Sequence, residues 1–294
     1  MWNDNSLRRT GELPMSTKYQ RIAVFDDTKR LYSTDADLIA AINNSKRKTE
    51  VFYENQYPEY EPHRFDRTDI VVSGKRSFEA AMELKKENPD SKIAVLNFAN
   101  AFHPGGGVVN GASAQEECLC RCSTLYPLLY RRTLRDQFYS YHEKINDPKA
   151  TDALIYTEEV VIFKTDTDLP TLMPKEDWIT VDVITCAAPD LRTKGNTYFE
   201  VTNGGADMRS AELFGYHVRR AIHILTAAAH KRADTVILGA FGCGAFQNDP
   251  KVVARAYKTA LQEFSGTFRK IEFAVYCPPQ GTTENYEAFD EVFR

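Results

Sequence analysis

The sequence predicts a mixed α/β fold with three layers, in which helices cover both faces of a largely parallel sheet. Short apolar runs that indicate buried strands alternate with longer segments that indicate helices. Connections of helical length favour parallel neighbours. Two glycine-rich segments directly follow predicted strands, at the sheet edge where such folds bind ligands. We expect residues 1–90 to form an N-terminal helical extension packed on a core of residues 91–294, together a single structural unit.

The N-terminal elements follow from capping and breaker signals. Residues 19–45 are predicted to be helical, with Ser33 or Thr34 as the N-cap ahead of an apolar run. A connector rich in tyrosine and proline follows at 53–65. The helix that begins at 77 should end at Asn88, because the residue before a proline is pushed out of the α region.

The core elements come next in chain order. A first buried strand is predicted at 92–100, and the segment after its glycine loop, 115–129, is predicted to be helical. The remaining predicted strands are 154–165, 178–188, 234–241 and a final one at 270–277, and the remaining helices are 211–232 and 249–266.

Composition excludes several classes of protein. Charged residues make up 27% of the chain and the net charge is −4, which is ordinary for a globular protein and argues against a nucleic-acid binder. The one basic cluster, at 46–48, is typical of a solvated loop. No apolar run is long enough to cross a membrane, and residues 1–16 lack the apolar core of a signal peptide. We therefore expect a cytoplasmic or nuclear protein that binds neither membranes nor nucleic acids directly.

The six cysteines show no pattern of a metal site or a disulfide framework. None forms a Cys-x-x-Cys pair, so a reducing compartment fits best. Cys118 and Cys122 share a helix face, and buried packing is favoured over a zinc site for them. Cys243 could be taken for a nucleophile, but no histidine stands near it in a recognisable pattern, and a small loop residue is the simpler interpretation.

The two glycine-rich loops, at 103–111 and 239–250, are candidates for anion binding. Glycine allows a positive φ and lets a ligand approach the main chain. Converging amide groups in such loops hold phosphate oxygens, so two neighbouring loops suit a diphosphate in an acidic protein. Tight turns alone would explain either loop equally well. Neither loop has the Lys-Ser/Thr of a P-loop, which disfavours ATP hydrolysis.

Adjacent carboxylates, Glu116 and Glu117, stand near the start of the helix predicted at 115–129. Acids in the first turn of a helix interact favourably with the helix dipole. Stabilisation of the helix would therefore explain the two carboxylates without any catalytic role. Successive helical residues point about 100° apart, so the two carboxylates should have different roles. One positioned carboxyl with a pKa raised by burial is the expected acid for cleaving a glycosidic bond.

Taken together, "GGGVVNGASAQEE", "NFANAFHPGGG" and "VILGAFGCGAFQNDP" resemble the motifs of microbial-type poly(ADP-ribose) glycohydrolases, the bacterial and fungal enzymes built on a macrodomain. The similarity extends to "VDVITCAAPDLR" and "RRAIHILTAAA", so it covers most of the chain. The resemblance implies a macrodomain fold, poly(ADP-ribose) or ADP-ribosylated proteins as substrates and ADP-ribose as product. It implies no cofactor and no metal.

The resemblance also implies roles for particular residues. Glu117 would be the catalytic acid, Glu116 would bind ribose hydroxyls, and Gln115 would brace the loop. Asn100 would contact the terminal ribose, and Phe246 would pack against it. The remaining substrate-binding residues would be Gly105, Gly106, Gly107 and Val108 in the first loop, and Gly242, Cys243, Gly244 and Ala245, whose amides would bind the diphosphate, in the second.

Two rival functions remain open at this stage. A macrodomain without catalysis would read ADP-ribose, although the intact acid pair argues against a pure reader. A related hydrolase of mono-ADP-ribose on proteins, or of O-acetyl-ADP-ribose, would use the same pocket on a different bond. We expect a monomer.

Overall fold

The computed structural model describes residues 16–192 and 209–294, and within them the strands form one seven-stranded sheet in the order β1-β4-β5-β3-β6-β7-β2. Neighbours among β5, β3, β6, β7 and β2 are parallel, whereas β4 is antiparallel to both β1 and β5. The strands are β1 (Glu50–Phe52), β2 (Asp69–Ser73), β3 (Ile93–Phe98), β4 (Leu154–Ile162), β5 (Ile179–Cys186), β6 (Thr235–Leu238) and β7 (Lys270–Ala274). The largely parallel mixed sheet predicted from the sequence is confirmed.

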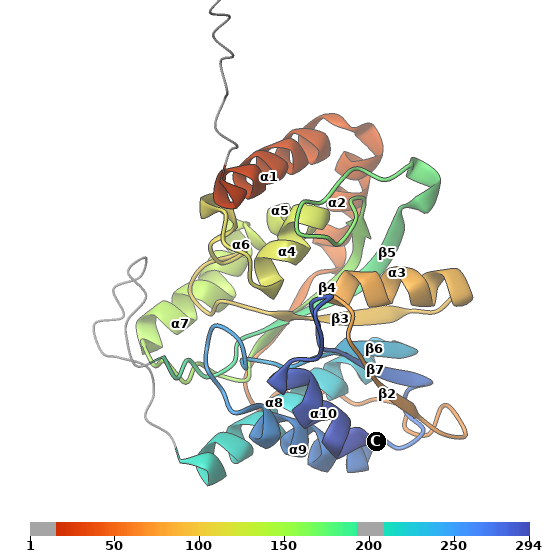
Figure 1. Cartoon of the computed structure of the whole chain (residues 1–294), viewed down its shortest axis with the longest axis vertical. Helices are drawn as coiled ribbons and strands as arrows, with labels where there is room; N and C mark the ends of the chain where they lie inside the picture. Colours follow the sequence, from red (N-terminus) through yellow and green to blue (C-terminus); the bar gives the residue numbers. More distant parts are fainter. Residues whose placement is uncertain (1–15, 193–208) are drawn as a thin grey trace, which may run out of the picture.

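Helices cover both faces of the sheet and complete the predicted three layers (Figure 1). One side carries α8 (Ser210–His230), α9 (Pro250–Ala260) and α10 (Glu284–Phe293). The other side carries α1 (Thr17–Thr34), α2 (Ala36–Lys48), α3 (Ser77–Glu87), α4 (Gln115–Cys122) and α5 (Leu125–Leu129). Shorter elements are η1 (Val108–Asn110), α6 (Arg132–Leu134), η2 (Arg135–Tyr139), α7 (Ser140–Ile145), η3 (Lys175–Asp177) and η4 (Leu261–Phe264).

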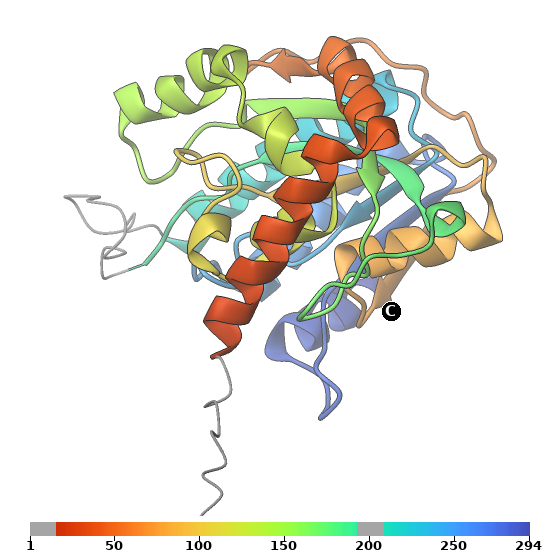
Figure 2. The ribbon, with the colours of Figure 1, turned by 90° about the horizontal axis from the view of Figure 1, so that it is seen from above.

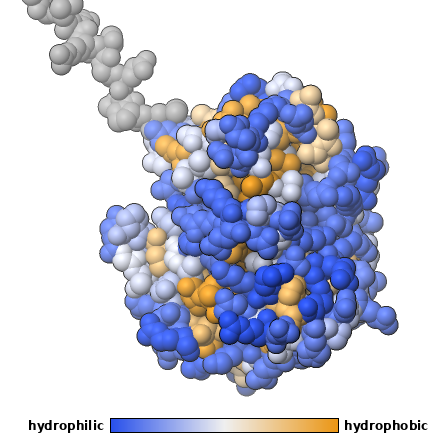
Figure 3. Space-filling view, turned by 90° about the vertical axis from the view of Figure 1, so that its right-hand side faces the viewer, coloured by the Kyte–Doolittle hydropathy of each residue, from blue (hydrophilic) through white to orange (hydrophobic). Residues whose placement is uncertain are grey.

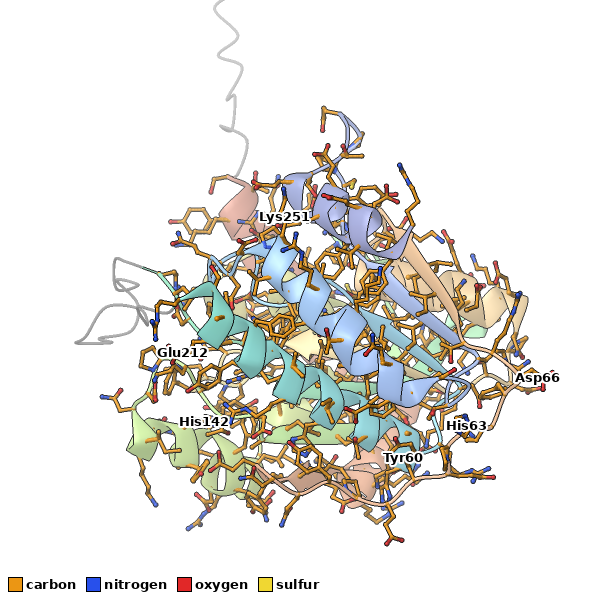
Figure 4. All side chains as sticks on the ribbon, turned by 90° about the horizontal axis from the view of Figure 1, so that it is seen from below. Tyr60, His63, Asp66, His142, Glu212 and Lys251 are labelled. Carbon is orange, nitrogen blue, oxygen red and sulfur yellow. The ribbon has the colours of Figure 1, made fainter. Side chains whose placement is uncertain are left out.

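Strand β3 shows how the two layers of helices are held to the sheet. Ala94 and Leu96 pack in the apolar cluster that includes α8 and α9, whereas Ile93 and Val95 pack in the cluster that includes α3 and α4. Because successive side chains of a strand point to opposite faces, the continuous apolar run of β3 packs into the apolar clusters on both sides of the sheet. Seen from below, α8 and α9 lie side by side under the sheet (Figure 4).

The N-terminal segment differs in detail from the prediction. The helix expected at 19–45 is two helices, and the N-cap of the second is Asp35, which accepts hydrogen bonds from the amides of Asp37 and Leu38. Ser33 and Thr34 instead donate their hydroxyls to carbonyls one turn back, within α1. The expected cap position was therefore wrong by one or two residues.

Residues 1–90 were expected to be a helical extension, yet they also supply β1 and β2, which lie at the two edges of the sheet. The extension is thus continuous with the core at both edges. Residues 1–15, in the stretch predicted to lack a signal peptide, lie outside the described residues.

The later elements match the predictions except at a few places. The segment 115–129 is not one helix, because Ser123 takes an extended conformation and forms a bridge to Ile162. Helix α10 and the short elements α6, η2, α7 and η3 were not predicted. The helix that begins at Ser77 ends at Glu87, directly before Asn88, as expected.

The surface view in Figure 3 is mainly hydrophilic, with small separate apolar areas of the kind most globular proteins expose. Among the helices formed by residues 16–192 and 209–294, none is long and apolar enough to cross a membrane.

Candidate active site

A pocket of about 750 Å³ opens where β3, β6 and β7 end. The pocket is lined by Phe98, the last residue of β3, by Ala240 just after β6, and by Ala274 and Val275 at the end of β7. Both glycine-rich loops and the first turn of α4 contribute to its walls. The volume is typical of a site for a small molecule, and the carboxyl ends of parallel strands are where α/β sheets bind ligands.

Gln115 fixes the start of α4 to the sheet. Its side-chain amide donates to the carbonyl of Leu96 at 2.7 Å and to the hydroxyl of Ser77 at 3.0 Å. Its oxygen accepts from the amide of Phe98 at 2.9 Å. The helix that carries both carboxylates therefore begins at a fixed place beside the end of β3.

Glu116 is buried and held by three N–H donors. Its Oε2 accepts from the Asn100 amide at 2.8 Å, and its Oε1 accepts from the Gly105 amide at 3.2 Å and from Nδ2 of Asn97 at 3.3 Å. Burial raises the pKa of Glu116 to about 8; the nearby Glu117 carboxylate also raises it, while the N–H donors lower it. Glu116 is therefore rigidly oriented and retains a proton near neutral pH.

Glu117 has a different environment. Its Oε1 accepts from the Gly107 amide at 2.8 Å, whereas its Oε2 is buried and has no hydrogen-bond partner among the described residues. Both carboxylates line the pocket. The prediction that the two acids differ in role agrees with this contrast: one is bonded through both oxygens, and the other keeps one oxygen free.

The first glycine loop is shaped around these carboxylates. Gly105 and Gly106 have φ values of +71° and +56°, and a Cβ on Gly106 would collide with Oε1 of Glu117. The amides of Gly105 and Gly107 are already donated to carboxylate oxygens. The converging amides expected to hold phosphate therefore hold acidic side chains instead.

The second loop leaves its amides unused. Within the described residues, the N–H groups of Gly242, Gly244, Ala245 and Phe246 donate to no acceptor, and all four residues line the pocket. Gly242 has a φ of +77°, and a Cβ there would lie 2.6 Å from that of Ala188. This loop has the free donors that an anion needs.

Comparison with known proteins agrees with this geometry. A family model described as the catalytic domain of microbial-type PARG matches residues 25–165. The poly(ADP-ribose) glycohydrolase of Thermomonospora curvata is 29% identical with a TM-score of 0.79, over 94% of this chain and all of that one. A structure of the Deinococcus radiodurans enzyme in complex with ADP-ribose is 32% identical with a TM-score of 0.71, over 85% of this chain and 96% of that one. No curated protein sequence matches the chain.

The chain belongs to the microbial-type poly(ADP-ribose) glycohydrolase family.

Four of the predicted substrate-binding residues, Gly105, Gly106, Val108 and Cys243, do not line the pocket. The side chain of Val108 is fully buried in the apolar core, in an element that packs against α1 and α4, and does not line the pocket. The Cys243 amide is donated to the carbonyl of Ala240, and the thiol packs against the core on the α8 side. Burial raises the pKa of that thiol far above its usual range, which is the opposite of what a nucleophile needs.

Asn100 and the glycines of the first loop mainly stabilise the conformation of that loop. Oδ1 of Asn100 accepts from the amides of Phe102 and His103, which shapes the turn after β3, while the residue still lines the pocket. Of the three glycines, only Gly107 lines the pocket.

Sequence reasoning missed the residues that support the second loop. Nδ2 of Asn248 donates to the carbonyls of Pro189, Gly242 and Phe246, and Oδ1 of Asn248 accepts from Nε2 of His217 on α8. Burial lowers the pKa of His217 to about 4, so this histidine is neutral. No local pattern marks such a pair.

Cations on the pocket wall were also missed. Arg192 lies over the Phe246 ring at 5.1 Å and pairs with Asp190, and Arg76 lies over the Tyr276 ring at 4.1 Å. Lys18, Arg21 and Lys75 complete the set of basic residues that line the pocket. They come from separate segments, so only the fold brings them together.

The three cysteines of α4, Cys118, Cys120 and Cys122, are buried free thiols, as the packing interpretation predicts. In the part of the chain that the structure describes, no three side chains of His, Cys, Asp or Glu are grouped closely enough to hold a metal ion.

Proposed function

We propose that this protein hydrolyses the ribose–ribose O-glycosidic bonds of poly(ADP-ribose) and releases ADP-ribose, with Glu117 as the general acid. The observation that carries the proposal is the state of Glu117: its Oε1 is fixed by the Gly107 amide while its buried Oε2 has no partner among the described residues. A carboxyl held by one oxygen on the wall of a pocket can give a proton with the other.

The reaction then follows the usual chemistry of glycoside hydrolysis. Glu117 protonates the oxygen of the leaving ribose as the bond to the anomeric carbon breaks, and positive charge develops on the remaining ribose ring. Water adds to that carbon and returns its proton to the Glu117 carboxylate. Glu116, fixed by three N–H donors, orients ribose hydroxyls. Because burial raises the pKa of Glu116, this carboxyl keeps its proton near neutral pH.

The second loop is the proposed diphosphate site. The amides of Gly242, Gly244, Ala245 and Phe246, which have no acceptor among the described residues, supply four donors without a lysine in the loop. Phe246 is held by Arg192 over its ring, and we expect it to pack against the terminal ribose, which Asn100 would contact from the turn after β3. No step of this mechanism calls on a metal or a cofactor.

The proposal extends to the substrates, the compartment and the oligomeric state. Substrates would be poly(ADP-ribose) chains or ADP-ribosylated proteins, and the solved structures of relatives in complex with ADP-ribose support that product. All six cysteines are free, which fits a reducing intracellular compartment. We expect a monomer, with residues 1–90 and 91–294 acting as one structural unit.

A substrate panel tests the proposal. The native protein is incubated separately with purified poly(ADP-ribose), a mono-ADP-ribosylated protein and O-acetyl-ADP-ribose, and free ADP-ribose is measured by chromatography. We expect release from the polymer. Release only from the mono-modified protein or the acetyl ester would favour the related hydrolases. Binding of ADP-ribose with no release from any substrate would favour a reader.

A further inference from the structure

Helix α1 packs on the outer side of the helical layer that carries the two acids, against α4 and η1 (Figure 2). Thr28 donates its hydroxyl to the carbonyl of Arg121 on α4 at 2.7 Å. Lys164, which is almost completely buried, donates to the carbonyl of Val24 and to the carboxylate of Asp27. These buried contacts fix the helix relative to α4.

From this position, α1 touches the far end of the first glycine loop. Nε of Arg21 donates to the carbonyl of Gly111 at 2.7 Å. Gly111 has a φ of +71°, and a Cβ on it would lie 2.5 Å from the carbonyl oxygen of Lys18, so helix and loop are in close contact. On the α4 side, Arg121 donates to the carbonyl of the next residue, Ala112, at 2.6 Å.

The segment from Gly107 to Ala112 is short and internally bonded. The carbonyl of Gly107 accepts from the amides of Asn110 and Ala112, and the amide of Gly111 donates to the carbonyl of Val108. A displacement of Gly111 is therefore transmitted to Gly107. The amide of Gly107 is the group that fixes Oε1 of Glu117.

A second contact from α1 supports the near end of the same loop. Phe25 is buried and packs edge-on against Tyr126, with ring centroids 5.0 Å apart. The Tyr126 ring lies against Gly105, where a Cβ would approach it to 2.7 Å. The amide of Gly105 donates to Glu116. Helix α1 thus contacts the far end of the loop directly at Gly111 and supports its near end through the Tyr126 ring.

We infer that Arg21 is a positioning residue for the hydrolysis: by holding the Gly111 carbonyl, it keeps the Gly107 amide in place and so fixes the carboxyl of Glu117. This inference rests on the proposed function and adds helix α1 to the machinery of the site. Arg21 stands just before the stretch that the family model matches. It acts through the loop and does not itself exchange a proton with the substrate.

Arg21 also lines the pocket, so the competing role is attraction of the diphosphate by its charge. Three substitutions separate the two roles. Arg21→Gln removes the charge but places an amide nitrogen the same number of bonds from Cα as Nε. Arg21→Lys keeps the charge but places a methylene there. Arg21→Met removes both.

The control is Arg47→Met on α2, the same change at an exposed arginine that donates a hydrogen bond to the side chain of Asn44. For each protein, kcat and KM are measured on poly(ADP-ribose), the Kd for ADP-ribose is measured by calorimetry, and the melting temperature is recorded.

For Arg21→Met and Arg21→Lys, we expect kcat to fall about 10- to 100-fold, the scale expected when a reacting group is misplaced by about 1 Å. We expect Arg21→Gln to lose clearly less kcat than Arg21→Lys, Arg47→Met to stay within about threefold of the native kcat, and the Kd for ADP-ribose to change by less than about threefold in all four.

Two results would overturn the inference. One is a native kcat in Arg21→Met. The other is activity that follows charge, with Arg21→Lys close to native and Arg21→Gln impaired in both KM and Kd. If Arg21→Met does not fold, the kcat of Arg21→Gln compared with that of Arg21→Lys still distinguishes the positioning role from the charge role. A native protein that releases no ADP-ribose would contradict the proposed function, which is a separate outcome.

Discussion

The two glycine-rich loops of the pocket have similar compositions but opposite hydrogen-bonding states. In the first, the amides of Gly105 and Gly107 are donated to the carboxylates of Glu116 and Glu117. In the second, the amides of Gly242 and Gly244 donate to nothing within the described residues. The first loop thus holds the acids, and the second has donors left for a ligand. Glycine content alone would not have separated these two uses.

This comparison predicts that substitutions in the first loop lower the rate of hydrolysis, whereas substitutions in the second loop weaken the binding of ADP-ribose. Of the substitutions within the two loops, the largest effect is expected from Gly106→Ala. Its Cβ would collide with Oε1 of Glu117, and its φ of +56° is unfavourable for alanine. We expect hydrolysis of poly(ADP-ribose) to fall by about 100-fold or more, because the acid is displaced from its working position.

Gly215→Ala on α8 is the matched control, since nothing lies within 4 Å of a Cβ at that position. It should be neutral or slightly stabilising. Near-native hydrolysis by Gly106→Ala would show that the first loop does not position the acids.

A smaller and different effect is expected from Gly242→Ala. A Cβ there would press on Ala188 and on the Asn248 amide that holds the loop, at a φ of +77°. We expect the Kd for ADP-ribose to rise about 10-fold and the free energy of unfolding to fall by about 1–3 kcal/mol. Calorimetry and denaturant unfolding measure the two. A loss of kcat with unchanged ADP-ribose affinity would contradict the assignment of this loop to binding.

The buried state of Glu116 predicts a pH dependence of stability. Its pKa is raised from 4.5 to about 8, mainly by burial. The folded protein therefore keeps a proton that the unfolded chain loses above about pH 4.5, and the free energy of unfolding contributed by this group falls as pH rises to about 8. Glu116→Gln removes that dependence.

The melting temperature of Glu116→Gln, relative to the native protein, should therefore rise between pH 5 and pH 8. Any constant effect of the amide cancels in that comparison. A difference that stays the same across this range would contradict a raised pKa for Glu116.

The smallest effect is expected at Cys243, whose thiol is turned into the core beside the second loop. Cys243→Ser should keep the rate of hydrolysis within about twofold, because neither the thiol nor its amide faces the ligand. A thiol-blocking reagent applied to the native protein should likewise spare activity at short times. Loss of activity in the variant without loss of folded protein would restore a role for this thiol.

The sequence predicted the central strands and the acids well because their signals are local. The continuous apolar run at 92–100 is enough to indicate β3, and the Gln-Glu-Glu segment places both carboxylates at the start of a helix. The edge strands β1 and β2 were missed because they are short and only partly buried, so they show no clear apolar pattern.

The rest of the site depends on long-range contacts that no window of sequence contains. Arg21 bonds to Gly111, 90 residues away, and His217 bonds to Asn248, 31 residues away. The direction of the Cys243 side chain depends on a turn whose geometry only the folded loop defines. Helix α10 is a different case, because its signals are local and the prediction did not use them: Thr283 caps the helix, and Glu284 and Glu287 stand in its first turn.

The most direct test of the account is the rate of ADP-ribose release from poly(ADP-ribose) by Glu117→Gln, measured beside its Kd for ADP-ribose. Glu87→Gln, at an exposed position on α3, is the control for the same chemical change.

We predict that Glu117→Gln loses about 1,000-fold or more in rate, because the amide cannot give a proton to the leaving oxygen. The same variant should bind ADP-ribose within about threefold of the native protein, because the second loop is untouched. A variant that retained more than about a tenth of the native rate would show that Glu117 is not the acid, and the central claim would fail.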